Sequence, residues 1–354
     1  SPRTFILGMK LTEFNPGSGC GCKLGPEALQ CILESSGVRP EDHWPQLWVG
    51  HEHADDAAVV DLGDGRGLVQ TVDFFTPIVD DPYDFGRIAA TNALSDVYAM
   101  GGRPISALAL LAWPIERLPA DQAGRVIAGA RDVCREAGIP LAGGHSIDIP
   151  EPLFGLSVSG LVRKPDLKTN NQAQPGDVLF LTKPLGLGIL ATATKRGTAT
   201  EADREWAMAT MLQRNDVGAE LAEVDGVHSM TDVTGFGLAG HLLEVARASG
   251  LAAELEVAKV PTYDPERLRA LYQQFCLPNL TTTNYRAIQA DSSPMDGYTM
   301  ATLCDPQTSG GLLVFASADA APQIERLLTN AGLPCTPVGR MLPERADQPR
   351  LTLV

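Results

Sequence analysis

The stretch "GLVQTVDFFTPIVDDPYDFGRIAATNALSDVYAMG", residues 67–101, contains a strand pattern followed by a helix pattern. Residues 67–75 are largely apolar and end in two phenylalanines, which is typical of a strand. Residues 84–101 carry small and apolar side chains and stop at Gly101, which predicts a helix that ends there. Together these two patterns indicate part of a mixed α/β unit.

Similar patterns on both sides of this stretch extend the unit. Apolar or alternating runs bounded by Gly and Asp predict strands, whereas apolar residues at helical spacing predict helices. The expected strands are 47–50, 57–63, 67–75, 105–113, 139–148 and 153–162, and the expected helices are 25–36, 84–101 and 120–137.

A second α/β unit is expected after residues 163–177. That stretch is polar, contains two prolines and lacks apolar periodicity, so it is the best candidate for a domain boundary. With 354 residues the chain also exceeds the length at which one core usually stops growing. The expected division is 1–44, an arm and helix, then α/β domains at 45–165 and 176–354. Elements expected in the last domain are strands 178–182 and 310–317 and helices 186–195, 201–224, 236–249 and 318–331.

Composition and charge exclude several classes of protein. The chain is 44% hydrophobic and 20% charged, and it has no apolar run long enough to span a membrane. Its formal net charge is −15, so the chain lacks the excess of Lys and Arg that general nucleic-acid binding needs. We therefore expect no membrane and no nucleic-acid partner. The N-terminus shows no signal-peptide pattern, so the expected compartment is the cytoplasm.

Aspartates recur at strand ends or inside apolar segments. Asp55 and Asp56 precede a strand, Asp73 lies near the end of one, Asp96 lies in a helix of small residues, and Asp232 lies in "MTDVTGFGLAGH". Any one of them alone fits an N-cap, a turn or a solvated face. Several together favour an oxygen-rich site for Mg²⁺, which prefers carboxylates, water and phosphate oxygens.

The segment "NPGSGCGCKLG", residues 15–25, combines Cys20, Cys22 and Lys23 with four glycines, which predicts a flexible arm. A thiolate there would be a nucleophile or a carrier of a soft atom, and the lysine charge would lower the thiol pKa. The other five of the seven cysteines are expected to be reduced core residues, because their odd total and spacing do not fit a disulfide framework.

Three other motifs carry weaker signals. The histidines of "HEH", residues 51–53, are two apart at a strand end, so we expect exposure rather than a metal site. The segments "AGGHSID" (142–148) and "QTSGGLL" (307–313) contain paired glycines that would allow backbone amides near phosphate oxygens. Neither is a Walker A or a GxGxxG sequence, and such segments are more often turns.

Six motifs taken in order carry a family signature. The chain closely resembles the selenophosphate synthetase (selenide, water dikinase) family from about residue 10 to the C-terminus, most weakly over 163–177 and 255–298. The motifs are "GSGCGCK", "DDAAVVDLG", "TVDFFTPIVDDPYDFGRIAATNALSDVYAMGG", "LAGGHSIDIPEPLFGLSVSG", "MTDVTGFGLAGH" and "LCDPQTSGGLL".

The resemblance implies a phosphotransferase with paired acceptors. ATP, selenide and water would give selenophosphate, phosphate and AMP in a reaction that requires Mg²⁺ and supplies selenium for selenocysteine and selenouridine. It also implies the two-domain α/β fold of the aminoimidazole ribonucleotide synthetase-like superfamily and a homodimer built around the N-terminal sheets. Residues 45–165 would then be the ATP-binding and dimerisation domain. A selenium-delivery protein is a candidate partner.

The resemblance also assigns roles to residues by motif position. Cys20 matches the catalytic cysteine of the family, whereas Cys22 matches a second cysteine without a required role. Lys23 matches the catalytic lysine, which also contacts the nucleotide. The residues that match Mg²⁺ ligands are Asp56, Asp96 and Asp232. The remaining matches to nucleotide contacts are His53, Ala54, Asp55, Asp73, Asp96, Gly143, Gly144 and His145.

Two other functions fit parts of the same pattern. One is another ATP-dependent enzyme of the superfamily, similar to thiamine-monophosphate kinases or hydrogenase-maturation proteins, although the Cys-Gly-Cys-Lys segment disfavours the kinase. The other is a selenium or copper carrier that uses Cys20 and Cys22 for transfer and in which the aspartates are structural. ATP consumption separates these hypotheses, because a carrier would bind its cargo without hydrolysing ATP.

Overall fold

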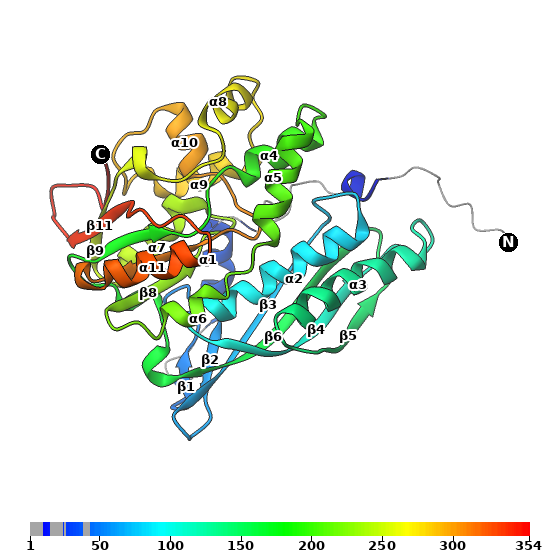
Figure 1. The fold of residues 1–354 in the computed structure, drawn as a ribbon, viewed down its shortest axis with the longest axis horizontal. Coiled ribbons are helices and arrows are strands. Elements are labelled where there is room, and N and C mark those ends of the chain that lie inside the picture. Colours follow the sequence, from blue (N-terminus) through cyan, green and yellow to red (C-terminus); the bar gives the residue numbers. More distant parts are fainter. Residues whose placement is uncertain (1–9, 15–23, 25, 38–42) are drawn as a thin grey trace.

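Two six-stranded sheets organise the part of the chain that the structure describes (Figure 1). The structure is a computed structural model, and it describes residues 10–14, 24, 26–37 and 43–354. One sheet comes from residues 47–163 and the other from residues 178–353. Both are mixed, since each has one parallel pair among antiparallel ones. In the described residues no helix is both long and apolar enough to cross a membrane.

The first sheet has the strand order β1-β2-β3-β6-β4-β5. Its strands match the sequence-based expectations closely, because each is a short apolar or alternating run between turn residues. The strands are β1 (Leu47–Val49), β2 (Ala58–Asp61), β3 (Arg66–Phe75), β4 (Arg103–Ala112), β5 (Leu141–Ile147) and β6 (Leu153–Arg163), and the preceding helices are η1 (Leu11–Phe14) and α1 (Pro26–Ser35).

Two helices, α2 (Pro82–Ala99) and α3 (Ala120–Glu136), cover one face of this sheet. The α2 helix begins where the Asp81 side chain accepts a hydrogen bond from the Asp84 backbone N–H. It ends before Gly101, whose φ of 81° suits glycine at a helix end. The α2 helix also contacts β8, α5 and α6 of the second half, so it lies between the two halves (Figure 1).

The second sheet has the order β12-β9-β11-β7-β10-β8, and helices cover both of its faces. Its strands are β7 (Val178–Leu181), β8 (Val227–Asp232), β9 (Leu251–Leu255), β10 (Leu312–Ala316), β11 (Gly339–Pro343) and β12 (Leu351–Leu353). Its helices are α4 (Leu187–Lys195), α5 (Glu201–Leu212), α6 (Val217–Leu221), α7 (Gly237–Ala248), α8 (Pro265–Gln273), α9 (Asn279–Ile288), α10 (Gly297–Leu303) and α11 (Ala321–Asn330). Short 3₁₀ turns are η4 (Lys164–Asp166), η5 (Asn170–Gln172), η6 (Val257–Lys259) and η7 (Ala318–Ala320).

The structure corrects the expectations for the second half at one helix. The single helix expected over 201–224 is wrong, because the chain leaves the helix at Gln213 and α6 begins only at Val217. Asn215 lies in this break and donates hydrogen bonds to Ser95 of the first half and to the Gly310 carbonyl. The break therefore lets a polar side chain join the two halves.

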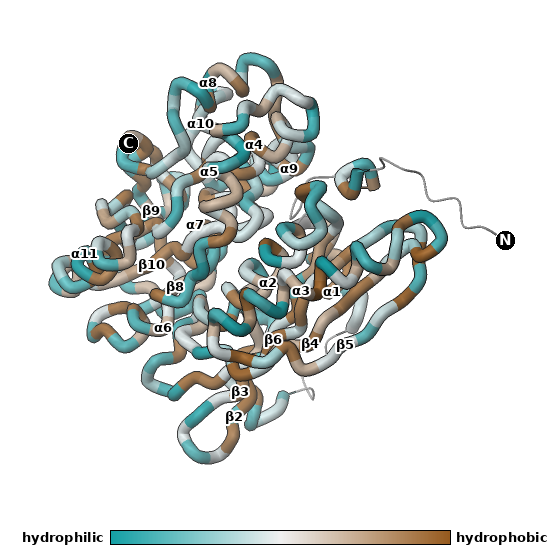
Figure 2. Tube along the Cα trace, turned by 45° about the vertical axis from the view of Figure 1, so that its right-hand side comes forward, coloured by the Kyte–Doolittle hydropathy of each residue, from teal (hydrophilic) through white to brown (hydrophobic). Residues whose placement is uncertain are grey.

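One face of the first sheet carries exposed apolar side chains, whereas α2 and α3 bury the other. Figure 2 shows hydrophobic stretches along the strands of this sheet. Isolated exposed apolar residues are common in proteins, but a contiguous set on one sheet face is typical of an interface. The exposed residues are Val72 and Phe74 on β3, Ile105 and Leu108 on β4 and Ile147 on β5.

Candidate functional site

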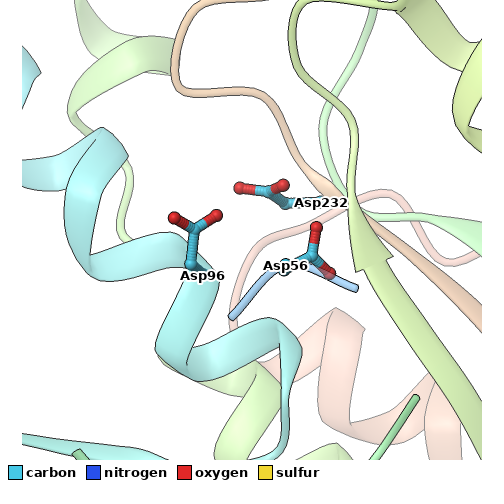
Figure 3. Close-up of side chains that lie close together, drawn as sticks. All are labelled: Asp56, Asp96 and Asp232. Atoms are coloured by element: carbon cyan, nitrogen blue, oxygen red, sulfur yellow. The ribbon is translucent and has the colours of Figure 1, made fainter. Parts of the chain in front are cut away.

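Three carboxylates from distant parts of the sequence meet between the two halves (Figure 3). Asp56 lies in the loop before β2, Asp96 on α2, and Asp232 at the end of β8. One oxygen from each side chain lies within 4.8 Å of the others. The structure thus brings together the three aspartates that the motif positions matched to metal ligands.

The environment of this cluster is unfavourable for carboxylates without a cation. Asp96 is 9% exposed and Asp232 is 2% exposed. Burial, followed by the negative charges of Asp232 and Asp96, holds the pKa of Asp56 well above its usual range. Among the described residues, Oδ2 of Asp56 and Oδ2 of Asp232 are buried without a hydrogen-bond partner. Buried carboxylate oxygens of this kind normally bind a cation or a donor.

Two threonines orient the cluster. The Thr71 hydroxyl on β3 donates a hydrogen bond of 2.6 Å to Asp96 Oδ2, and the Thr231 hydroxyl on β8 donates one of 3.1 Å to Asp56 Oδ1. Groups that hold metal-binding side chains in this way contribute to metal affinity. The donor set therefore fits a hard divalent cation, which prefers carboxylate oxygens and leaves room for water and phosphate ligands.

The segment His53–Asp55 lies beside the cluster and is held by Asn170 of η5. The Asn170 side-chain amide donates to the carbonyls of His53 and Ala54 at 3.0 and 2.9 Å, and its backbone N–H donates to Asp55 Oδ1 at 2.7 Å. Ala54 has a φ of 54°, which few residues other than glycine adopt. Asn170 lies in 163–177, where polarity predicted only a boundary, so sequence analysis missed this contact.

The remaining expected nucleotide contacts lie elsewhere on the first sheet. Asp73 is buried on β3, two residues after Thr71, and therefore faces α2. Gly143, Gly144 and His145 are exposed on β5, the edge strand. Three strands separate β5 from β2, which corresponds to about 19 Å across the sheet. Within one chain the structure thus does not bring 143–145 next to His53–Asp55.

Two expectations about cysteine and histidine were tested by the structure. The exposure expected for the "HEH" segment is confirmed, since His51, Glu52 and His53 are all exposed. The five described cysteines are free thiols, as expected. The expectation that all five are core residues is wrong, because Cys31 is exposed and Cys335 is half-buried, whereas Cys134, Cys276 and Cys304 are buried. Cys20, Cys22 and Lys23 lie outside the described residues, so their roles stay predictions.

Lys183 is a buried charged residue near the cluster that sequence analysis did not single out. It lies two residues after β7, is 2% exposed, and its ammonium donates a hydrogen bond of 2.8 Å to the Ser309 carbonyl. Burial lowers the pKa of Lys183 to about 7, and the negative charge of Asp232 opposes this shift. The signal available in the sequence was a lysine directly after the apolar run "VLFLT".

Known proteins match the chain over nearly its whole length. The N-terminal domain of the AIR synthase related protein family matches residues 54–162, and the C-terminal domain of that family matches residues 174–351. The selenide, water dikinase of Aeromonas salmonicida is 50% identical over 333 residues, which cover 94% of this chain and 95% of the relative. The protein of that name from Pasteurella multocida is 47% identical over 351 residues and covers 99% of both chains.

A solved structure has the same fold. Thiamine monophosphate kinase from Aquifex aeolicus, in its complex with AMPPCP and TMP, superposes with a TM-score of 0.66 at 18% identity and covers 98% of this chain and 96% of that one. This similarity and the two domain matches confirm the expected two-domain, mixed α/β fold. Because about half of the residues are identical to those of its relatives over nearly the full length, the chain belongs to the selenide, water dikinase family.

Proposed function

We propose that the chain is a selenide, water dikinase, that is, a selenophosphate synthetase. ATP, selenide and water give selenophosphate, orthophosphate and AMP, and the product supplies selenium for selenocysteine and selenouridine. The main support is the sequence identity of 50% with the selenide, water dikinase of Aeromonas salmonicida, over 94% of this chain. The meeting of Asp56 and Asp96 with Asp232 of the second half supports it, because metal ions held by carboxylates neutralise the phosphates of ATP in phosphoryl transfer.

In this proposal Asp56, Asp96 and Asp232 hold Mg²⁺. The bound ion would neutralise phosphate oxygens of ATP, which the acidic chain does not attract by itself. His53, Ala54 and Asp55 are the proposed nucleotide contacts at the edge of this site, and the bonds of Asn170 to the carbonyls of His53 and Ala54 support this role. Asp73 is the further contact expected on the α2 side of β3, and Gly143, Gly144 and His145 are expected contacts on β5.

The remaining roles are assigned to the N-terminal segment. Cys20 is the selenium-handling thiol, because thiolates are soft ligands and selenide is a soft nucleophile. Lys23 stabilises the negative charge that develops on the phosphate under attack.

We further propose a cytoplasmic location, where thiols stay reduced, and a selenium-delivery protein as the source of selenide.

The products of the reaction test this function directly. Phosphorus NMR of the purified protein with ATP, Mg²⁺ and selenide under anaerobic conditions is expected to show selenophosphate, orthophosphate and AMP in equal amounts. The orthophosphate should derive from the β position, because water attacks after the γ-phosphoryl group has gone to selenium. ADP as the main end product would indicate an ordinary kinase, and unconsumed ATP would indicate a carrier. Either result would reject the dikinase assignment.

We also propose that the exposed apolar face of the first sheet forms a homodimer interface. Its five apolar residues are each between 44% and 54% exposed, and the interior of a permanent interface is typically apolar. Phe74→Asp places a charge on this face and is expected to yield a 37.6 kDa monomer in sedimentation equilibrium. Phe275→Asp, at an exposed phenylalanine of the second half, is the matched control and should stay dimeric. A monomeric parent at micromolar concentration would contradict the proposal.

A further inference from the structure

The loop Asp305–Gly311, which contains the "QTSGG" sequence, is buried between the two halves. Asp305, Gln307, Thr308 and Ser309 are each at most 3% exposed. The Gln307 backbone N–H donates to the Thr234 carbonyl at 2.9 Å, and the Ser309 backbone N–H donates to Asn92 Oδ1 at 3.0 Å. The amides of Gln307 and Ser309 are therefore engaged within the protein and are not available to a phosphate.

Ser309 connects three elements through its own polar groups. Its backbone N–H binds Asn92 on α2, its carbonyl accepts from Lys183 at the end of β7, and its hydroxyl donates to the Met211 carbonyl on α5 at 2.5 Å. Its φ is 51°, a left-handed conformation that is costly for a residue with a side chain. A conformation of this cost persists only where the surrounding contacts hold it.

The loop that contains Ser309 is connected to the metal cluster from both halves. Asn92 lies four residues before Asp96, so the two side chains share one face of α2. On the other side, the Gly311 carbonyl accepts from the backbone N–H of Val233, the residue after Asp232, at 2.8 Å. The loop is tightly confined there, because a Cβ atom at Gly310 would lie 1.8 Å from the Val233 carbonyl oxygen. A shift of Ser309 would therefore move one carboxylate relative to the other.

We propose that Ser309 is a positioning residue that holds Asp96 and Asp232 at metal-binding distance by joining Asn92 to Lys183. This inference rests on the metal role assigned to the cluster above. A buried ammonium is costly, and the lowered pKa of Lys183 reflects that cost, so packing alone does not account for a lysine at this position.

Mn²⁺ binding without nucleotide, followed by electron paramagnetic resonance, and urea unfolding test the proposal. Asn92→Leu removes the acceptor of the Ser309 N–H, and Lys183→Met removes the donor to its carbonyl. Each is expected to weaken Mn²⁺ binding by about 10- to 100-fold, as loss of a group that supports metal ligands does. The double variant should bind Mn²⁺ only slightly less tightly than the single variant with the lower affinity, because either change alone already releases Ser309.

The direction in which Lys183→Met changes the Mn²⁺ affinity separates positioning from simple electrostatics. Removing a positive charge near Asp232 would by itself tighten Mn²⁺ binding, whereas loss of positioning weakens it. Lys168→Met, at a second buried lysine in the linker, controls for removing a buried ammonium and should keep the parent affinity.

Two results would overturn the proposal: parent affinity in both single variants, or losses of affinity that multiply in the double variant. If Asn92→Leu does not fold, Asn92→Ala replaces it in the same comparison. If Asp232→Asn binds Mn²⁺ as the parent does, the metal assignment itself fails. In that case urea unfolding of the parent, the two single variants and the double variant tests the coupling. If the losses in unfolding free energy from Asn92→Leu and Lys183→Met add in the double variant, coupling through Ser309 is rejected.

Discussion

Asp232→Asn is expected to weaken Mg²⁺ binding by more than about 100-fold, beyond the usual effect of losing a supporting group, and to lower turnover accordingly. The amide carries no negative charge and is a poorer ligand for a hard cation. The stability of the metal-free protein should change in the opposite direction. Because the three carboxylates lie within 4.8 Å of one another, removing one charge should stabilise the metal-free fold by about 1–3 kcal/mol.

Two measurements check this pair of effects. Calorimetric titration with Mg²⁺ and ATP gives the affinity, and urea unfolding in the presence of a chelator gives the stability. Asp177→Asn is the matched control, because Asp177 is 1% exposed and precedes β7, at the other end of that strand from Lys183. It should keep parent affinity. Asp232→Asn with parent affinity, stoichiometry and turnover would show that the two halves do not share a metal site.

Cys20→Ser is expected to lower selenophosphate formation by about 10³-fold or more, in line with the loss of a nucleophile in other enzymes. A hydroxyl does not carry selenium as a thiolate does, because it is harder and stays protonated at neutral pH. Affinity for Mg²⁺ and ATP should stay near the parent value, because the carboxylate cluster is unchanged. This result would differ from that of Asp232→Asn, which changes binding itself.

Phosphorus NMR of the products and thermal melts of the variants make this comparison. Cys22→Ser is the matched control two residues away, and we expect a milder effect because no required role is assigned to Cys22. Thermal melts of both variants should match the parent. Selenophosphate formation at the parent rate in Cys20→Ser would remove Cys20 from the mechanism.

Local patterns were sufficient for most elements of the first half. The alternation of 67–75 and the glycine after 84–101 predicted β3 and α2, because period and helix stops are local properties. The same approach failed at 201–224, where the four polar residues 213–216 interrupt the helix and Asn215 among them reaches Ser95. It also left 251–303 largely unassigned, although β9 and α8 to α10 lie there.

By itself the sequence determined the family, the two α/β units and the identity of the three aspartates, because each is encoded in contiguous motifs. Only the tertiary structure decided that Asp56, Asp96 and Asp232 share one buried cluster and that Asn170 holds His53 and Ala54. It also decided that Lys183 and Asn92 meet at Ser309. The physical reason is that these hydrogen bonds of Asn170 and Ser309 join residues 116 to 217 positions apart, through strand ends and loops whose proximity no local periodicity encodes.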